Sequence, residues 1–230
     1  MFEHDRRGSM NKQSLRKTWA IIPLLAALGL SLVAVNPALA RGIDTEPLAK
    51  DESEERILSV LDDIRHGPCT DDLHGRLLRI LAESTKAKNV VEIGTGNGYS
   101  ALWLCLGLKT TGGHLVTHEI DPEQVLLARA NFKRAGVENL VTVVEGDAHR
   151  TVAKLKEPID ILFMDAEGGN LDYLHQLLPL VRPGGLILAD NMKKPKPDPR
   201  FIKAITTNPN LETIFLNMHS TGISLTLKKD

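Results

Sequence analysis

The feature that most constrains this chain is a regular alternation of short apolar runs with helix-like stretches. The apolar runs have strand length, and we expect strands at residues 89–93, 115–119, 140–144, 159–164 and 186–189. Helices are expected between them at 99–108, 122–135, 149–155 and 171–181, followed by the turn Arg182-Pro183-Gly184-Gly185. Strands that alternate with helices form parallel pairs, so this order predicts an α/β fold with a mostly parallel sheet and helices on both faces.

Further elements flank the alternation. Two amphipathic helices are expected before it, over 52–64 and 72–84, and His66-Gly67-Pro68 separates them. A helix over 199–206 and strands over 212–216 and 223–227 are expected after it. One domain over 52–230 is therefore predicted, with a polar linker over 41–51 before it.

The first forty residues differ in composition from the domain. Lys12, Arg16 and Lys17 precede the uncharged stretch 18–40, which ends in Ala38-Leu39-Ala40. A basic start, an apolar run and a small-residue end predict a signal peptide over 1–40 and export to a periplasmic location. The alternative is an uncleaved membrane anchor, because the uncharged stretch is long enough to span a bilayer.

Charge and cysteine content exclude several classes of function. With 28 Lys and Arg against 29 Asp and Glu, the net charge of −1 gives no electrostatic reason to expect a nucleic acid as partner. The two cysteines, Cys69 and Cys105, cannot form a disulfide framework, and no Cys/His cluster has zinc-site spacing.

A glycine-rich loop follows the first strand of the alternation. Gly94, Gly96 and Gly98 lie between the strand and the helix that begins at Tyr99. Glycine lets the backbone turn tightly and approach a ligand, and the helix start presents free N–H groups to an anionic group. Because ligands of such folds bind at the carboxyl ends of the strands, the loop predicts a nucleotide-type site. The alternative is a plain strand-to-helix turn.

Two acidic residues bear on the cofactor class. Glu119 ends the second strand, where a carboxylate can accept both ribose hydroxyls, as in an NAD(P) site. Glu92 lies inside the first strand, where a buried carboxylate is costly unless it is paired. Glu92 and the spacing G-x-G-x-G, in place of G-x-G-x-x-G, favour S-adenosylmethionine. An NAD(P)-binding Rossmann enzyme is the alternative.

Three polar residues end apolar strands. Asp165 follows the strand 159–164, and Asp190 and Asn191 follow the strand 186–189. Their oxygens would point into one cleft if the two strands are neighbours, which is typical of Mg²⁺ or a similar divalent cation with positions left for a bidentate substrate. The alternative is that they cap the following helices, because Asp and Asn are favoured there.

The chain from about Asp72 to Lys228 resembles the cation-dependent class I O-methyltransferases, the family of catechol and caffeoyl-CoA O-methyltransferases. The matching stretches are Gly75-Arg76-Leu77-Leu78, residues 90–104, Thr117-His118-Glu119-Ile120-Asp121-Pro122, Val144-Glu145-Gly146-Asp147-Ala148, Phe163-Met164-Asp165-Ala166 and residues 183–191. The resemblance implies a Rossmann-like, seven-stranded methyltransferase sheet whose last strand is antiparallel. It also implies methylation of a small catechol-like or vicinal diol hydroxyl, with a homodimer left open.

The resemblance also implies roles for individual residues. For S-adenosylmethionine, Thr70 and Gly94 would contact the methionine part, Ser100 the carboxylate, Glu119 the ribose, and Ile120, Ala148 and His149 the adenine. The other expected cofactor-binding residues are Glu92, Gly96, Gly98, Gly146, Asp147 and Asp165. The divalent cation would be held by Asp165, Asp190 and Asn191, which are also the expected catalytic residues.

One departure from the family pattern concerns proton removal. Family members usually carry a lysine three residues after the first metal-binding aspartate, where it helps deprotonate the acceptor hydroxyl. Gly168 occupies that position here, and Glu167 or His149 is the remaining candidate to assist. The alternative is a non-catalytic protein of the same fold that binds S-adenosylmethionine.

Overall fold

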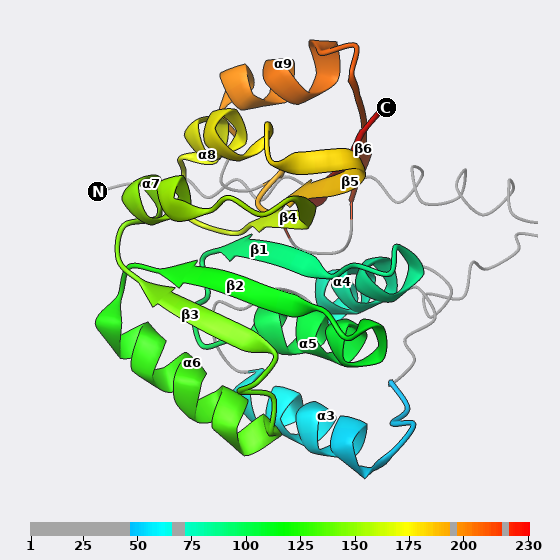
Figure 1. Ribbon diagram of the computed structural model, residues 1–230, viewed down its shortest axis with the longest axis vertical. Helices are drawn as coiled ribbons and strands as arrows, with labels where there is room; N and C mark the ends of the chain where they lie inside the picture. Colours follow the sequence, from blue (N-terminus) through cyan, green and yellow to red (C-terminus); the bar gives the residue numbers. More distant parts are fainter. Residues whose placement is uncertain (1–46, 66–71, 194–196, 218–220) are drawn as a thin grey trace, which may run out of the picture. The chain divides into compact units, whose positions relative to one another are not determined.

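The computed structural model describes residues 47–65, 72–193, 197–217 and 221–230 (Figure 1). The predicted signal peptide or anchor, part of the predicted linker, and Thr70 lie outside the described residues, so export and membrane attachment stay predictions. Among the residues described, no helix is long and apolar enough to cross a bilayer.

The described strands form one seven-stranded sheet with the order β3-β2-β1-β4-β5-β7-β6. Their bounds are β1 Asn89–Ile93, β2 His114–Glu119, β3 Val141–Glu145, β4 Ile159–Met164, β5 Val181–Ala189, β6 Leu211–Leu216 and β7 Ile223–Lys228. Strands β1 to β5 pair in parallel, whereas β7 runs antiparallel to both of its neighbours, β5 and β6. The predicted mostly parallel sheet with an antiparallel last strand is confirmed.

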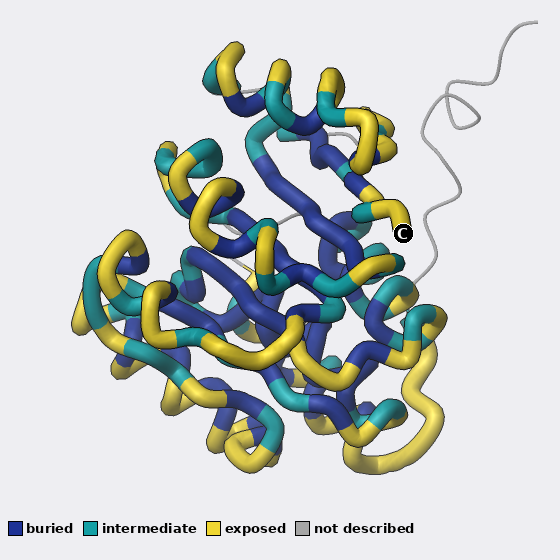
Figure 2. Tube along the Cα trace, turned by 45° about the horizontal axis from the view of Figure 1, so that its top comes forward, coloured by how far each residue is buried: buried dark blue, intermediate teal, exposed yellow. Residues whose placement is uncertain are grey.

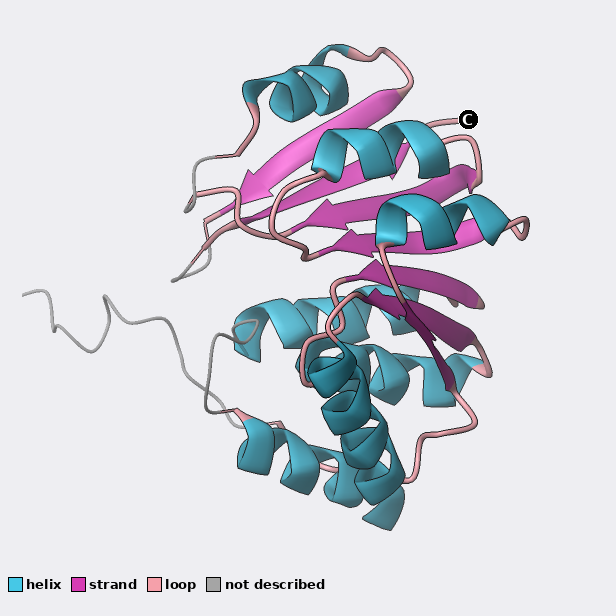
Figure 3. Cartoon of the chain, turned by 90° about the vertical axis from the view of Figure 1, so that its left-hand side faces the viewer, coloured by secondary structure: helices cyan, strands magenta, loops and turns pink. Residues whose placement is uncertain are grey.

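Helices cover both faces of the sheet (Figure 3). One side holds α3 (Glu52–Ile64), α4 (Asp72–Ser84), α5 (Tyr99–Thr111) and α6 (Pro122–Ala135), and the other holds α7 (Ala148–Thr151), the 3₁₀ turn η2 (Val152–Lys154), α8 (Asn170–Leu177) and α9 (Pro199–Thr207). Each side has its own hydrophobic cluster, and neighbouring strand residues such as Val90 and Val91 belong to opposite clusters. This follows from the alternation of side chains along a strand.

The helix α5 is buried along most of its length. Every residue from Tyr99 to Leu108 is buried, because α5 packs against the helices α3 and α4 and against the strand β2. Figure 2 shows the same contrast across the molecule, with buried central strands and helices whose outer sides are exposed. The glycine loop therefore leads directly into a helix that is packed on several sides.

The boundary between α8 and β5 differs from the prediction. The helix expected to reach Val181 ends at Leu177, and the strand expected to begin at Leu186 already begins at Val181. Ile159 pairs with Val181 but Ile161 pairs with Leu186, so Arg182-Pro183-Gly184-Gly185 bulges from the sheet. The local sequence Pro-Gly-Gly indicates only a turn, but hydrogen bonding to β4 on both sides of it makes the segment part of one strand with a bulge.

Candidate functional site

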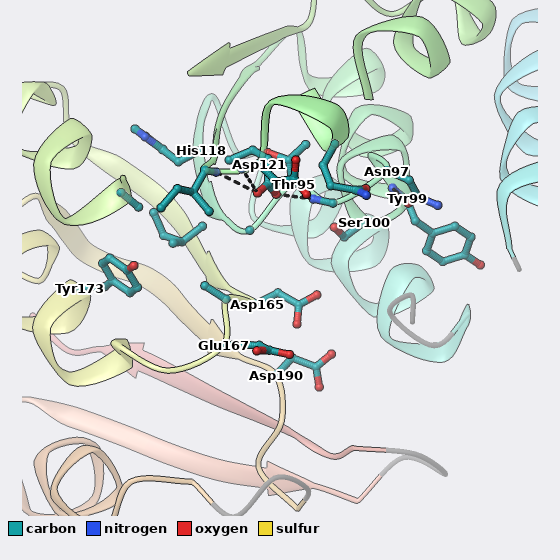
Figure 4. Close-up of a pocket in the computed structure, with 18 of the residues that line it drawn as sticks. Thr95, Asn97, Tyr99, Ser100, His118, Asp121, Asp165, Glu167, Tyr173 and Asp190 are labelled. Carbon is teal, nitrogen blue, oxygen red and sulfur yellow. Dashed lines mark hydrogen bonds between the residues drawn. The ribbon is translucent and has the colours of Figure 1, made fainter. Parts of the chain in front are cut away.

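A cavity of about 990 Å³ lies at the carboxyl edge of the parallel strands. Its walls come from the ends of β1, β2, β4 and β5, from the start of α7, and from the loop after β4 (Figure 4). This is the edge at which doubly wound folds bind ligands, and the volume suits a nucleoside-sized ligand together with a small second molecule.

The cavity brings together most of the residues that the sequence analysis selected. Those that line it are Gly94, Gly96, Ser100, Glu119, Ile120, Asp147, Ala148, His149, Asp165, Asp190 and Asn191. Glu92, Gly98 and Gly146 are not part of its wall, and Thr70 lies outside the described residues. Gly98 is the N-cap residue of α5 with φ of +89°, and a Cβ there would lie 2.7 Å from the Phe132 ring, so its role is in packing.

The cavity wall also contains residues that were not predicted from the sequence. These are Ile93, Thr95, Asn97, Tyr99, His118, Asp121, Gln124, Leu127, Ala166, Tyr173 and Thr221. Most of them are direct neighbours of predicted residues and could have been found by extending each motif by a few positions. Tyr173 and Thr221 carried no local signal, because the fold brings them to the cavity from α8 and from the segment before β7.

Glu119 ties the glycine loop to the end of β2. The Gly96 N–H donates to its Oε2 atom at 2.8 Å, while the N–H groups of Ile120 and Asp121 donate to Oε1 at 2.8 and 2.9 Å. Gly96 has φ of +50°, which favours glycine. Oε2 accepts only one of these bonds, so it keeps capacity to accept a ligand hydroxyl.

Gly94 allows the segments that follow β1 and β4 to lie close together. Its φ is +94°, and a Cβ would lie 2.7 Å from the carbonyl oxygen of Asp165. A side chain at this position would push the glycine loop away from Asp165. The glycine therefore keeps the loop and the first of the predicted cation ligands together.

Glu92 is fully buried behind the cavity wall. It accepts hydrogen bonds from Ser100 Oγ at 2.5 Å and from Thr117 Oγ1 at 2.6 Å. The pairing that a buried carboxylate requires is thus supplied by hydroxyl groups. Burial raises the pKa of Glu92 to about 8, although the two hydroxyl bonds act to lower it, and the charges of Asp165 and Glu119 add to the rise.

The raised pKa of Glu92 predicts a pH-dependent stability of the cofactor-free protein. The folded state favours the protonated carboxyl of Glu92. The contribution of this group to the free energy of unfolding is therefore complete below the unfolded pKa of about 4.3 and is lost as the pH rises through about 8. We expect the melting temperature of the parent to fall more steeply between about pH 5 and pH 9 than that of Glu92→Gln, which stays neutral. Thermal melts followed by circular dichroism measure this, and parallel curves for the two proteins would contradict it.

Asp165, Asp190 and Asn191 lie at the ends of the neighbouring strands β4 and β5, where they line the cavity. Asn191 Nδ2 is 3.5 Å from Asp165 Oδ1. The alternative that these residues cap helices is wrong, because the N-cap of α8 is Gly169 and that of α9 is Asp198.

Asp190 is almost fully buried and held from three directions. Its Oδ1 atom accepts from the Asn191 N–H and from Thr221 Oγ1, both at 2.6 Å, and its Oδ2 atom is 3.3 Å from His74 Nδ1. Burial acts to raise the pKa of Asp190, but the hydrogen bonds from His74 and Thr221 outweigh it, so the pKa lies below its usual value. Asp190 is therefore an anion near neutral pH.

The chemistry of these side chains fits a hard divalent cation. No group of three His, Cys, Asp or Glu side chains in the described part of the chain could hold a metal ion. A cation here would instead take two carboxylates and the carboxamide oxygen of Asn191, an all-oxygen set that suits Mg²⁺. The Asn191 amide needs only to turn over to present its oxygen in place of its nitrogen.

Another part of the cavity wall is aromatic and apolar. The rings of His149 and Tyr173 stack with centroids 4.4 Å apart and planes at 20°. Gly169 makes room for them, because a Cβ there would lie 2.9 Å from the Tyr173 ring and 3.1 Å from the His149 ring. Ile120 and Leu127 also face this cavity and are 67% and 46% exposed. Such surfaces suit the flat face of a base.

The charge of the described cavity wall is strongly negative. Its acidic residues are Glu119, Asp121, Asp147, Asp165, Glu167 and Asp190, and it contains no lysine or arginine. His118 adds no positive charge near neutral pH, because burial lowers its pKa to about 4. The cavity therefore favours ligands that carry positive charge.

The loop after Asp165 leaves open space where the family pattern places a lysine. Gly168 has φ of +81°, and no atom lies within 4 Å of the position that its Cβ would occupy. The neighbouring Glu167 is exposed and lines the cavity.

Comparisons with known proteins agree with this geometry. The family model described as O-methyltransferase matches residues 68–195. The chain is 38% identical to the catechol O-methyltransferase of Niastella koreensis over 51% of the chain and 55% of that protein, and 35% identical to the catechol O-methyltransferase of Mycobacterium tuberculosis over 73% of the chain and 70% of that protein. The match thus spans only about half the length of the first of these relatives.

A solved structure extends the similarity to nearly the whole described fold. The O-methyltransferase from Bacillus cereus, in complex with SAH, superposes with a TM-score of 0.68 at 28% identity. The superposition covers 85% of this chain and 97% of the other.

Proposed function

Because the chain belongs to the O-methyltransferase family, we propose that it transfers the methyl group of S-adenosylmethionine to a hydroxyl of a small catechol-like or vicinal diol substrate. We further propose that Asp165, Asp190 and Asn191 hold a divalent cation for this reaction. One observation carries the proposal: a single cavity joins a glycine loop and a ribose-type acid, Glu119, to these three oxygen ligands.

The charge of the cavity supports S-adenosylmethionine over a dinucleotide. The cofactor carries a positive sulfonium and a positive ammonium group, whereas the pyrophosphate of NAD(P) is doubly negative. Six carboxylates and no lysine or arginine line the described wall, so a pyrophosphate would meet repulsion with no cationic side chain to offset it. The dinucleotide alternative is disfavoured on this ground as well as by the family.

The chain contributes mainly position and electrostatics to the proposed reaction. The glycine loop and Glu119 hold the nucleoside, and the His149–Tyr173 side receives the base. A cation bound by Asp165, Asp190 and Asn191 would bind both oxygens of a diol and lower the pKa of the hydroxyl. The acceptor oxygen loses its proton and bonds to the methyl carbon while the carbon–sulfur bond breaks. The sulfonium leaves as a neutral thioether, so no covalent enzyme intermediate is needed.

Glu167 is the side chain that we propose for removal of the proton. The lysine that family members use is replaced by Gly168, whose surroundings are open. Glu167 is exposed and part of the cavity wall, so its carboxylate can accept the proton and exchange it with solvent.

An assay of methyl transfer tests the proposed function. The protein is incubated with S-adenosylmethionine, Mg²⁺ and a panel of catechols, aliphatic vicinal diols and monophenols, and the formation of S-adenosylhomocysteine is measured. We expect turnover of catechols and much slower turnover of monophenols, which cannot offer two oxygens to one cation. Binding of S-adenosylhomocysteine without turnover of any acceptor would instead favour the non-catalytic alternative.

Replacement of Glu119 is expected to weaken cofactor binding. Glu119→Ala removes the acceptor for the ribose hydroxyls, and we expect a loss of about 1–3 kcal/mol, a roughly 5- to 150-fold higher Kd for S-adenosylhomocysteine in calorimetry. Glu145→Ala is the matched control, because Glu145 ends the neighbouring strand β3 in register with Glu119 but does not line the cavity. Equal affinities of the two variants would remove Glu119 from the cofactor site.

A further inference from the structure

A buried histidine outside the motifs of the sequence contacts the cation-ligand group. His74 lies in α4, is fully buried, and is 116 residues from Asp190 in the chain. Its Nδ1 atom is 3.3 Å from Asp190 Oδ2, and α4 packs chiefly against α5. The contact thus links the helical layer to the end of β5.

The surroundings of His74 argue against a purely stabilising role. Its Nε2 atom is buried and has no hydrogen-bond partner among the described residues. A buried polar atom without a partner costs free energy, and an apolar residue at this position would avoid that cost. The benefit of an imidazole here must therefore come from its other nitrogen, which faces Asp190.

The hydrogen bonds of Asp190 divide between its two oxygens. Oδ1 accepts from Asn191 N–H and from Thr221 Oγ1, so the end of β5 and the segment before β7 hold that atom. Among the described residues, the side-chain partner of Oδ2 is His74 Nδ1, at 3.3 Å. Without it, the carboxylate could rotate about its own axis and lose its orientation toward the cavity.

We infer that His74 is a positioning residue that donates from Nδ1 to Asp190 Oδ2 and thereby orients this carboxylate for a divalent cation. The inference rests on the proposed function, because it takes Asp190 as a cation ligand. Side chains that hold a metal-binding group in place commonly change metal affinity by about 10- to 100-fold when they are replaced. His74 is expected to affect cation binding but not cofactor binding, since it does not line the cavity.

Direct measurement of Mn²⁺ binding tests the inference. The Kd for Mn²⁺ is measured by electron paramagnetic resonance with S-adenosylhomocysteine present, and the Kd for S-adenosylhomocysteine is measured by calorimetry without metal. We expect His74→Leu to weaken Mn²⁺ binding by about 10- to 100-fold and to leave cofactor affinity within about twofold. His74→Asn, whose amide can donate from nearly the same position as Nδ1, should recover most of the lost affinity.

A control in the same helix separates orientation of Asp190 from loosening of α4. Leu78 is fully buried one turn further along, so Leu78→Ala disturbs the packing of α4 without removing a donor to Asp190. We expect it to bind Mn²⁺ like the parent protein. Equal Mn²⁺ affinity of His74→Leu and the parent, or equal losses in His74→Leu and Leu78→Ala, would overturn the inference about His74 but not the proposed cation site. A parent protein that binds no Mn²⁺ would overturn the proposed cation site itself.

Discussion

Loss of methyl transfer by at least about a thousandfold is the expected result of chelating divalent cations with EDTA, because a bound cation supplies several kcal/mol of stabilisation to the developing oxyanion. Asp165→Ala and Asp190→Ala should have the same effect, since each removes one of the two carboxylates that we propose as cation ligands. Mg²⁺ or Mn²⁺ added in excess should restore the chelated parent protein but neither variant. The rate of S-adenosylhomocysteine formation is the measurement.

Two controls make this result specific to the cation site. Calorimetry with S-adenosylhomocysteine should show that cofactor binding survives EDTA, because the glycine loop and Glu119, which we propose for the nucleoside, are not among the proposed cation ligands. Asp198→Ala removes an aspartate that caps α9 and does not line the cavity, so its activity should stay close to that of the parent. Full activity in the presence of EDTA would show that transfer proceeds without a cation.

The largest loss of stability is expected from Gly75→Ala. Gly75 lies in α4 where that helix crosses α5, and a Cβ there would lie 2.1 Å from Trp103 Cδ1. The Trp103 ring is 2% exposed and is enclosed by the core, so it cannot move aside freely. Overpacking of this kind costs about 3 kcal/mol or more, which exceeds the gain of roughly 1 kcal/mol from replacing glycine in a helix. The net loss is then about 2 kcal/mol or more, and we expect the melting temperature to fall by roughly 4–8 °C.

A double-mutant cycle tests the cause of that loss. Trp103→Leu removes the ring that the new methyl group would meet, so Gly75→Ala should cost much less in that background. Urea unfolding of the four proteins measures the coupling between the two positions. If the cost of Gly75→Ala is the same in both backgrounds, the contact with Trp103 is not its cause.

Much of the site could be predicted because its signals are local. The glycines after β1, the acid at the end of β2 and the polar residues at the ends of β4 and β5 each depend on a few neighbouring residues, and Gly94, Glu119 and Asp165 all line the cavity. The parallel sheet followed from the alternation of strands and helices, since a strand–helix–strand unit has few ways to pack. Family resemblance added the antiparallel last strand, which periodicity alone does not specify.

Local patterns failed where pairing between distant segments decides the structure. The strand β5 continues past its Pro-Gly-Gly segment because β4 supplies hydrogen-bond partners on both sides of the bulge. Helix capping was a sound local alternative for Asp165 and Asp190, and only the positions of α8 and α9 exclude it.

By itself, the sequence determined the α/β class of the fold, the edge of the sheet at which the cavity lies and about half of the residues that line it, because periodicity and turn chemistry act over a few residues. Only the tertiary structure decided which side chains support those residues. His74 reaches Asp190 across 116 residues, Thr221 reaches it across 31, and Tyr173 stacks on His149 from another helix. Such contacts depend on strand register and helix packing, which many distant residues set together, so no short stretch of sequence contains them.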